Sequence, residues 1–116
     1  MGRWAQARKR GGGPGGVSFQ LDPPSGAQFI WHDDGDGNAA AEVPGSPAAA
    51  IYFEVQVCVG NVAGPALPWG NNQIGPTGDT LEYGPFDAVR VWAHCRWLNA
   101  SQNPISAYSD PLYVDF

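Results

Sequence analysis

The densest group of side chains able to do chemistry is a short acidic run, DDGDGN, in the first third of the sequence. Asp34, Asp36 and Asn38 offer oxygen ligands at alternate positions, which is the arrangement that calcium-binding loops use. The match is incomplete, because Ala39 stands where such a loop turns at glycine and Gly45 stands where it places its bidentate glutamate. The alternative is an exposed acidic turn between strands. We expect that turn, with no bound metal and no cofactor.

Catalytic chemistry has little support in the sequence. His32 and His94 are the candidate bases, but no serine or cysteine stands in a motif that marks a nucleophile. The glycine-rich residues 11–16 lack the strand and the helix that flank a phosphate-binding loop. We therefore predict that the protein is not an enzyme and takes no small-molecule substrate.

A row of residues typical of recognition surfaces alternates along residues 88–97. If this segment is a strand, successive side chains point to opposite faces of the sheet. Val89, Val91, Ala93 and Cys95 then face the core, and the residues between them face outward. Trp, Tyr and Arg are enriched at the energetic centres of interfaces. We predict a partner-binding sheet face made by Arg90, Trp92, His94, Arg96 and, on the neighbouring strand, Tyr52.

The alternative for this face is that its residues satisfy one another. Glu54 would then form a cross-strand ion pair such as one with Arg90, and Trp92 would lie flat on the sheet. Trp69, in a loop rich in Gly and Pro, is either a second anchor for the partner or a plug of the core.

The two cysteines fall on strands that we expect to be neighbours. By alternation Cys58 points outward and Cys95 inward, and side chains on opposite faces of a sheet cannot form a disulfide. We expect two free thiols, which is typical of synthesis in a reducing cytoplasm.

Turn signals and alternating hydrophobicity predict about seven short strands as the elements that position these residues. Gly and Pro account for 27 of the 116 residues, which excludes a helical bundle. We expect strands over residues 17–21 (an edge strand), 27–31, 51–59, 80–83, 88–97 and 112–116, and a short irregular strand within residues 60–79. A polar loop is expected over residues 32–38, and residues 39–50 give no clear pattern. The predicted fold class is all-β, an antiparallel two-sheet sandwich.

Charge is divided unevenly along the chain. Residues 1–16 hold four cations and no acid, a formal charge of +4, whereas residues 17–116 hold two arginines and all eleven acids, a formal charge of −9. Fixing a backbone costs about 1–2 kcal/mol per residue, so this glycine-rich segment would gain a fixed shape only against neighbouring chains. We predict an N-terminal arm over residues 1–16 and a sandwich domain over residues 17–116. The arm residues expected to bind a partner are Arg3, Trp4, Arg8, Lys9 and Arg10.

The first residues do not predict export. A positively charged start is not followed by the apolar stretch of about 7–15 residues that a signal peptide needs. No apolar run approaches the roughly 18 residues of a membrane span. We expect synthesis in the cytoplasm, without secretion or membrane insertion.

Three segments match a known strand pattern. Residues 89–93 (VRVWA), 106–114 (SAYSDPLYV) and 52–57 (YFEVQV) resemble the sixth, last and third strands of fibronectin type III domains. Trp31 stands where the second strand of that family carries a buried Trp, whereas Asp87 stands where the family usually has Tyr. The resemblance covers residues 17–116 and implies a sandwich; a generic immunoglobulin-like sandwich is the near alternative.

The resemblance also implies a setting. Domains of this type commonly form parts of bacteriophage capsids and tails, which implies a structural or decoration protein of a bacteriophage-like virion. Its partners would be other virion proteins and copies of itself, and it would reside in the virion after synthesis in the host cytoplasm.

Two other functions fit the same residues. A free-standing recognition module could bind a glycan or a protein surface through Trp69 or Trp92. Nucleic-acid contact by the arm is not expected to contribute much, because four cations give only a modest, salt-sensitive affinity.

Overall fold

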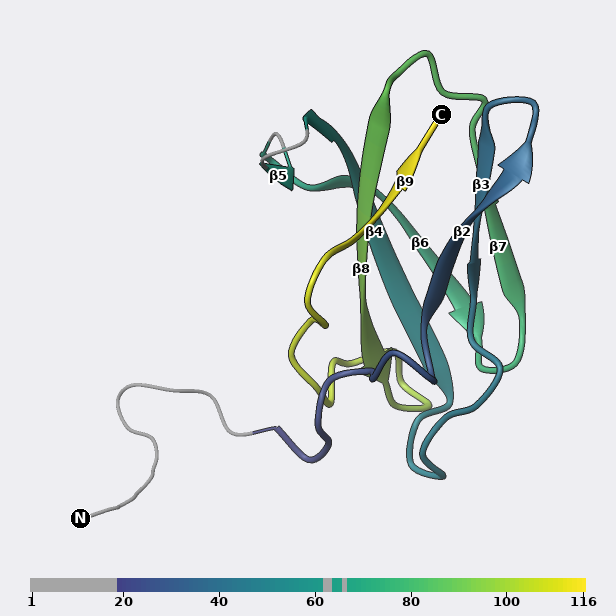
Figure 1. Ribbon diagram of the computed structural model, residues 1–116. Helices are drawn as coiled ribbons and strands as arrows, with labels where there is room; N and C mark the ends of the chain where they lie inside the picture. Colours follow the sequence, from purple (N-terminus) through teal and green to yellow (C-terminus); the bar gives the residue numbers. More distant parts are fainter. Residues whose placement is uncertain (1–18, 62–63, 66) are drawn as a thin grey trace.

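The computed structural model describes residues 19–61, 64–65 and 67–116, and this part of the chain forms strands and no helix. The strands are β2 (Ile30–Gly35), β3 (Asn38–Glu42), β4 (Tyr52–Asn61), β5 (Gly64–Pro65), β6 (Gly70–Pro76), β7 (Thr80–Tyr83), β8 (Arg90–Leu98) and β9 (Leu112–Asp115). They form a three-stranded and a five-stranded antiparallel sheet, stacked as in a sandwich (Figure 1). The predicted fold class is confirmed. No helix capable of crossing a bilayer occurs among the described residues.

The larger sheet is built around β4 and β8. Its order is β5-β4-β8-β9, and β6 also pairs with β4. Alternating apolar residues give both central strands one apolar face, and the register places Phe53 opposite Trp97 and Val55 opposite Cys95. These four side chains are fully buried and form one wall of the core.

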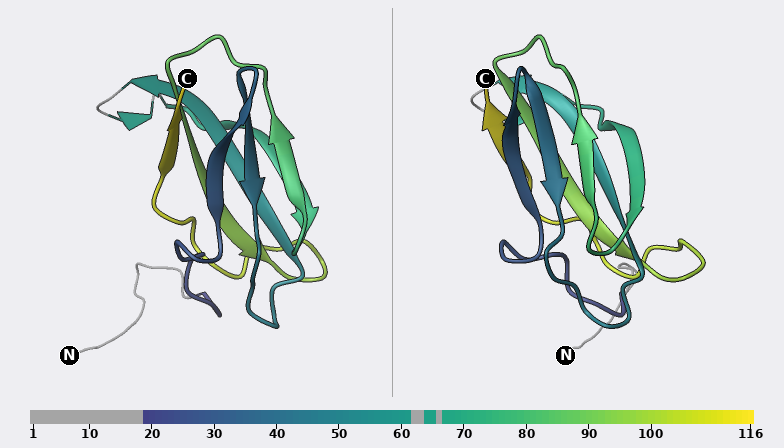
Figure 2. Two further views of the ribbon diagram at one scale, coloured as in Figure 1. Left: turned by 45° about the vertical axis from the view of Figure 1, so that its right-hand side comes forward. Right: turned by 90° about the vertical axis from the view of Figure 1, so that its right-hand side faces the viewer.

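The smaller sheet has the order β2-β3-β7 and supplies the opposite wall (Figure 2). Two side-chain hydrogen bonds connect the sheets. The Trp31 indole N–H donates to the Val91 carbonyl over 3.0 Å, and the Tyr83 hydroxyl donates to the Val55 carbonyl over 3.2 Å. The two rings meet edge to face, with centroids 5.7 Å apart. Burial raises the pKa of Tyr83, which keeps its hydroxyl protonated as a donor.

The hairpin of β2 and β3 corrects two predictions. Residues 26–28 form a turn, and β2 runs on through the acidic residues that we expected to be a loop. The chain reverses at Gly35, Asp36 and Gly37, whose φ values are 91°, 55° and 82°. β3 lies in the segment that gave no pattern. Neither strand alternates strongly between polar and apolar residues. β2 ends in acidic residues that resemble a loop, and β3 is mostly alanine.

Further differences occur at strand ends. Residues 19–22 form no strand, although the Leu21 amide donates to the Ile105 carbonyl over 2.9 Å; the rest of the expected edge strand and residues 1–16, with Arg3, Trp4, Arg8, Lys9 and Arg10, lie outside the described residues. Alternation along residues 51–59 and 88–97 places Val59 and Val89 on the apolar, core-facing sides of those segments, but the two side chains are 52% and 72% exposed. Val59 lies near the end of β4, and Val89 directly precedes β8.

Candidate functional site

The outward face of the five-stranded sheet gathers the predicted row. Directly opposite pairs across β4 and β8 are Glu54 and Arg96, Gln56 and His94, and Cys58 and Trp92. On the other side of β8, Tyr113 lies opposite Trp92 and Asp115 opposite Arg90. Tyr52 is half-buried at the end of β4, opposite Leu98. The placement of Arg90, Trp92, His94 and Arg96 on one face therefore matches the prediction.

His94 lies inside a column of rings on this face. Trp69 stacks on one side of the imidazole and Tyr108 on the other, with centroid distances of 3.8 Å in both cases and interplanar angles of 16° and 9°. The guanidinium of Arg96 continues the column, 4.6 Å from the Tyr108 ring centroid. Trp69 is therefore not a plug between the sheets, because it covers His94 on the outside of the larger sheet.

A directed chain of hydrogen bonds links the column to a buried carboxylate. Glu54 accepts from the Arg96 Nε over 2.6 Å and from the Asn72 Nδ2 over 2.7 Å. The Asn72 oxygen accepts from the Gln56 Nε2 over 3.1 Å, which leaves the Gln56 oxygen to accept from His94 Nε2 over 2.8 Å. A carboxylate can only accept, so the chain assigns the His94 proton to Nε2.

Burial and charge keep these groups in fixed protonation states. Burial lowers the pKa of His94 to about 4, and the nearby Arg96 acts in the same direction, so the imidazole is neutral at pH 7. Burial acts to raise the pKa of Glu54, but the hydrogen bonds from Asn72 and Arg96 outweigh it and the net shift is downward. The face is therefore organised around a neutral histidine and an ionised glutamate.

The other end of the row is organised around Arg90. Its guanidinium binds both oxygens of Asp115 over 2.5 and 2.7 Å and lies 3.6 Å from the centroid of the Tyr113 ring. The hydrogen bond to Asp115 raises the pKa of Arg90 and lowers that of the carboxyl. Trp92 meets Tyr113 with centroids 5.0 Å apart and lies against Gly60, where any side chain would overlap its ring.

These contacts include two features of the predicted alternative in which the residues of the face satisfy one another. The cross-strand ion pair exists, but Arg96 rather than Arg90 is the partner of Glu54, because the register puts Arg90 opposite Gly60. Trp92 does lie on the sheet, as expected. The roles of Tyr108 and Asn72 were not predicted, because Tyr108 lies outside the strands and Asn72 lies in β6, which has no alternating hydrophobic pattern.

The outward face of the smaller sheet is acidic. His32 forms an ion pair with Glu42, and a hydrogen bond with the Asp33 backbone is the main cause that raises the pKa of His32, while Glu42 adds to it. A hydrogen bond with Asp34 raises the pKa of Glu82. Within the described residues, no three His, Cys, Asp or Glu side chains are placed to hold a metal ion. The acidic run is not a loop as a whole: Asp33 and Asp34 belong to β2, Asn38 begins β3, and only Gly35, Asp36 and Gly37 make the turn between them.

The cysteines lie as predicted, on opposite faces of the larger sheet, and neither forms a disulfide. Cys95 belongs to the core, and burial raises the pKa of its thiol. Its amide donates to the Ser109 hydroxyl over 3.1 Å, which fixes the segment that precedes β9.

An apolar surface at one end of the sandwich was not predicted. We call it the apolar end; it comprises Val59, Leu67, Pro68, Phe86, Val89 and Phe116. Val59, Leu67, Val89 and Phe116 are 52%, 68%, 72% and 38% exposed. Val59, Pro68 and Phe86 line an open hollow of about 400 Å³. The Phe86 and Phe116 rings are 5.9 Å apart, and the Phe116 amide donates to the Val89 carbonyl over 2.9 Å, which makes the surface continuous.

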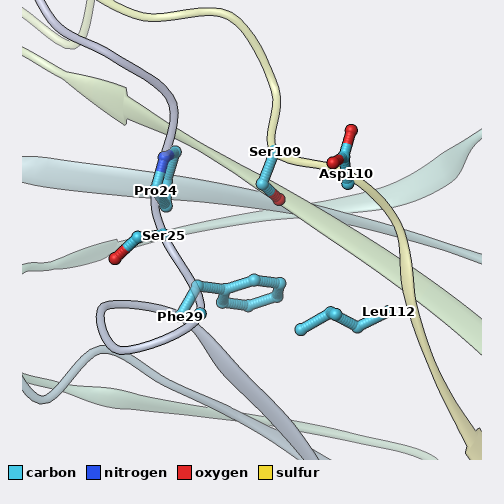
Figure 3. A pocket seen from close by; sticks show the side chains of 7 residues that line it. Pro24, Ser25, Phe29, Ser109, Asp110 and Leu112 are labelled. Carbon is cyan, nitrogen blue, oxygen red and sulfur yellow. The ribbon is translucent and has the colours of Figure 1, made fainter.

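A second, smaller cavity of about 270 Å³ lies between the chain entering β2 and the segment preceding β9 (Figure 3). Figure 3 shows Phe29 and Leu112 approaching from its two sides, with Ser109 and Asp110 above them. Its lining is mixed, because Ser25, Ser109 and Asp110 contribute polar groups.

The geometry defines the class of the protein as an all-β protein of two antiparallel sheets. Its larger sheet carries an aromatic and arginine column, and one end is apolar and exposed. No family model matches the sequence, and no curated protein matches it.

Proposed function

We propose that the protein is a structural or decoration component of a bacteriophage-like virion, built on a fibronectin type III or immunoglobulin-like domain. It joins neighbouring subunits through its N-terminal arm and the surface of its sandwich. The support for the virion setting is the resemblance of residues 52–57, 89–93 and 106–114 to strands of that domain family.

One observation carries the proposal of assembly. Residues 17–116 contain two cations, Arg90 and Arg96, and these are already bonded to Asp115 and Glu54. Nine other acids in the same segment have no lysine or arginine there to pair with, while the arm holds four cations and no acid. Opposite charges on two parts of the chain favour contact between the basic arm of one copy and the acidic body of another.

Deletion of residues 2–16 tests the assembly. At low salt, light scattering after size-exclusion chromatography should show that the full chain self-associates and that the deletion variant is a monomer. The far-UV circular dichroism spectrum of the deletion variant should be unchanged, which shows that its sandwich is still folded. Association of the full chain should weaken with salt, because exposed charges are screened. Equal association of both proteins would refute the proposal.

The rival function, glycan recognition, has its own readout. Trp69 and Tyr113 are only partly covered, and exposed rings of this kind can stack on sugars. The assembly proposal predicts no signal on a glycan array. A signal that Trp69→Ala abolishes would favour recognition instead.

A further inference from the structure

We propose that the apolar end receives the Arg3–Trp4 pair of a second copy, so that copies join head to tail. This inference rests on the proposed function and names the site on the neighbouring subunit. It follows from three features: the apolar hollow, the composition of the arm, and the end of the sandwich at which the described chain begins.

The apolar end has the properties of an unoccupied docking surface. Large exposed apolar patches on a soluble protein mark interaction sites, and this one joins four side chains that are each more than a third exposed. Its open hollow of about 400 Å³ falls within the ~300–1,000 Å³ typical of small-ligand pockets, so an indole ring fits within it. The walls of Val59, Pro68 and Phe86 suit an aromatic ring.

The arm offers one side chain that matches. Trp4 is the single aromatic residue among residues 1–18, and Arg3 precedes it. At the apolar end, the exposed Asp87 directly follows Phe86 in the chain and is the nearest acidic residue in the sequence to that wall. An indole in the hollow with a guanidinium beside it would meet both requirements, and Trp and Arg are the types that dominate such anchors.

The positions favour a neighbouring copy over the same chain. The described chain enters at one end of the sandwich, whereas the C terminus and the apolar end lie at the other (Figure 1). Fourteen residues separate Trp4 from Phe19, and the fifteen Cα-to-Cα steps between the two span at most about 50–54 Å when extended, which is long enough to reach a neighbouring subunit. Contacts between unlike surfaces propagate into rings or filaments.

The test measures binding of a fluorescent peptide of residues 1–16 to full-length Trp4→Ala protein by anisotropy. This acceptor keeps its apolar end and lacks the ligand side chain. Val59→Asp in the acceptor places a charge in the hollow. Ile51→Asp is the matched control, because both are exposed β-branched residues and Ile51 directly precedes β4, whereas Val59 lies near the other end of that strand. Asp87→Lys is a second acceptor variant, in an exposed loop, that removes the carboxylate.

We expect Val59→Asp and Asp87→Lys each to weaken peptide binding by about tenfold or more, and Ile51→Asp by less than about twofold. A Trp4→Ala peptide should bind as weakly as the native peptide binds to the Val59→Asp acceptor. Equal binding to the Val59→Asp and Ile51→Asp acceptors would overturn the inference. A further acceptor variant, Leu112→Asp, places a charge in the cavity of Figure 3. If only this variant lost peptide binding, the inference would also be overturned, because the peptide would then bind in that cavity. The proposed function fails separately, if deletion of residues 2–16 leaves association unchanged.

Discussion

His94 connects the chemistry of the outward face to its packing. Its ring is held between Trp69 and Tyr108, and its Nε2 proton is committed to Gln56. A charged imidazole in that position would lose solvation and lie near Arg96, which explains why its pKa falls to about 4. The histidine therefore serves as a flat, neutral spacer in the column.

This state of His94 predicts a loss of stability in mild acid. Unfolded His titrates near 6.5, so between pH 6.5 and about 4 the unfolded chain binds a proton that the folded chain does not. The contribution is complete above pH 6.5 and is lost as the pH falls to about 4, by up to about 3 kcal/mol. Urea unfolding across this range measures it. His94→Phe keeps a ring in the column and cannot titrate, so its pH dependence in this window should be flatter; parallel profiles would contradict the explanation.

Gly60 is the second residue on which the face depends. A methyl group there would overlap the Trp92 ring and lie 2.6 Å from the Gly64 carbonyl oxygen. We expect Gly60→Ala to destabilise the fold by about 1–3 kcal/mol and to change the near-UV signal of Trp92. Gly70→Ala is the control, because its added methyl meets no atom within 4 Å. Similar melting temperatures for the two variants would contradict this packing.

At the scale of elements, two cross-strand ion pairs hold β8 to its neighbours in different environments. Glu54 is 10% exposed in its side chain, whereas Asp115 is 51% exposed. Removing the arginine leaves a buried carboxylate in the first case and a solvated one in the second.

We therefore expect Arg96→Met to cost about 2 kcal/mol of unfolding free energy and Arg90→Met to cost clearly less. Adding Glu54→Gln to Arg96→Met should recover part of the loss, since it removes the unpaired charge. Chemical denaturation of the four proteins gives these differences. A larger loss for Arg90→Met would show that exposure does not rank the two pairs.

The strands that sequence patterns predicted are those with strong alternation and one apolar face. β4, β7, β8 and β9 fall within one or two residues of their predicted bounds. The bounds of β2 and β3 were not predicted, because β2 continues through acidic residues that resemble a loop and the inward residues of β3 are alanines. The column around His94 could not be predicted, since Trp69 and Tyr108 reach it from irregular segments and only the assembled sheet brings them together.

At the scale of the molecule, the sandwich separates its surfaces. The smaller sheet presents acids, the larger sheet covers itself with the ring column, and the apolar end remains exposed. The basic arm belongs to the same chain as these surfaces. A chain with a basic arm, an acidic sandwich and an exposed apolar end has the complementary surfaces that a head-to-tail assembly needs.

Mixing two full-length variants tests that arrangement most directly. Trp4→Ala keeps the apolar end but lacks the anchor, and Val59→Asp keeps the anchor but blocks the hollow. Sedimentation velocity should show each variant alone as a monomer and an equimolar mixture as a heterodimer, because one productive arm-to-body contact is restored. A mixture that stays monomeric, or a single variant that associates as the native protein does, would contradict the account.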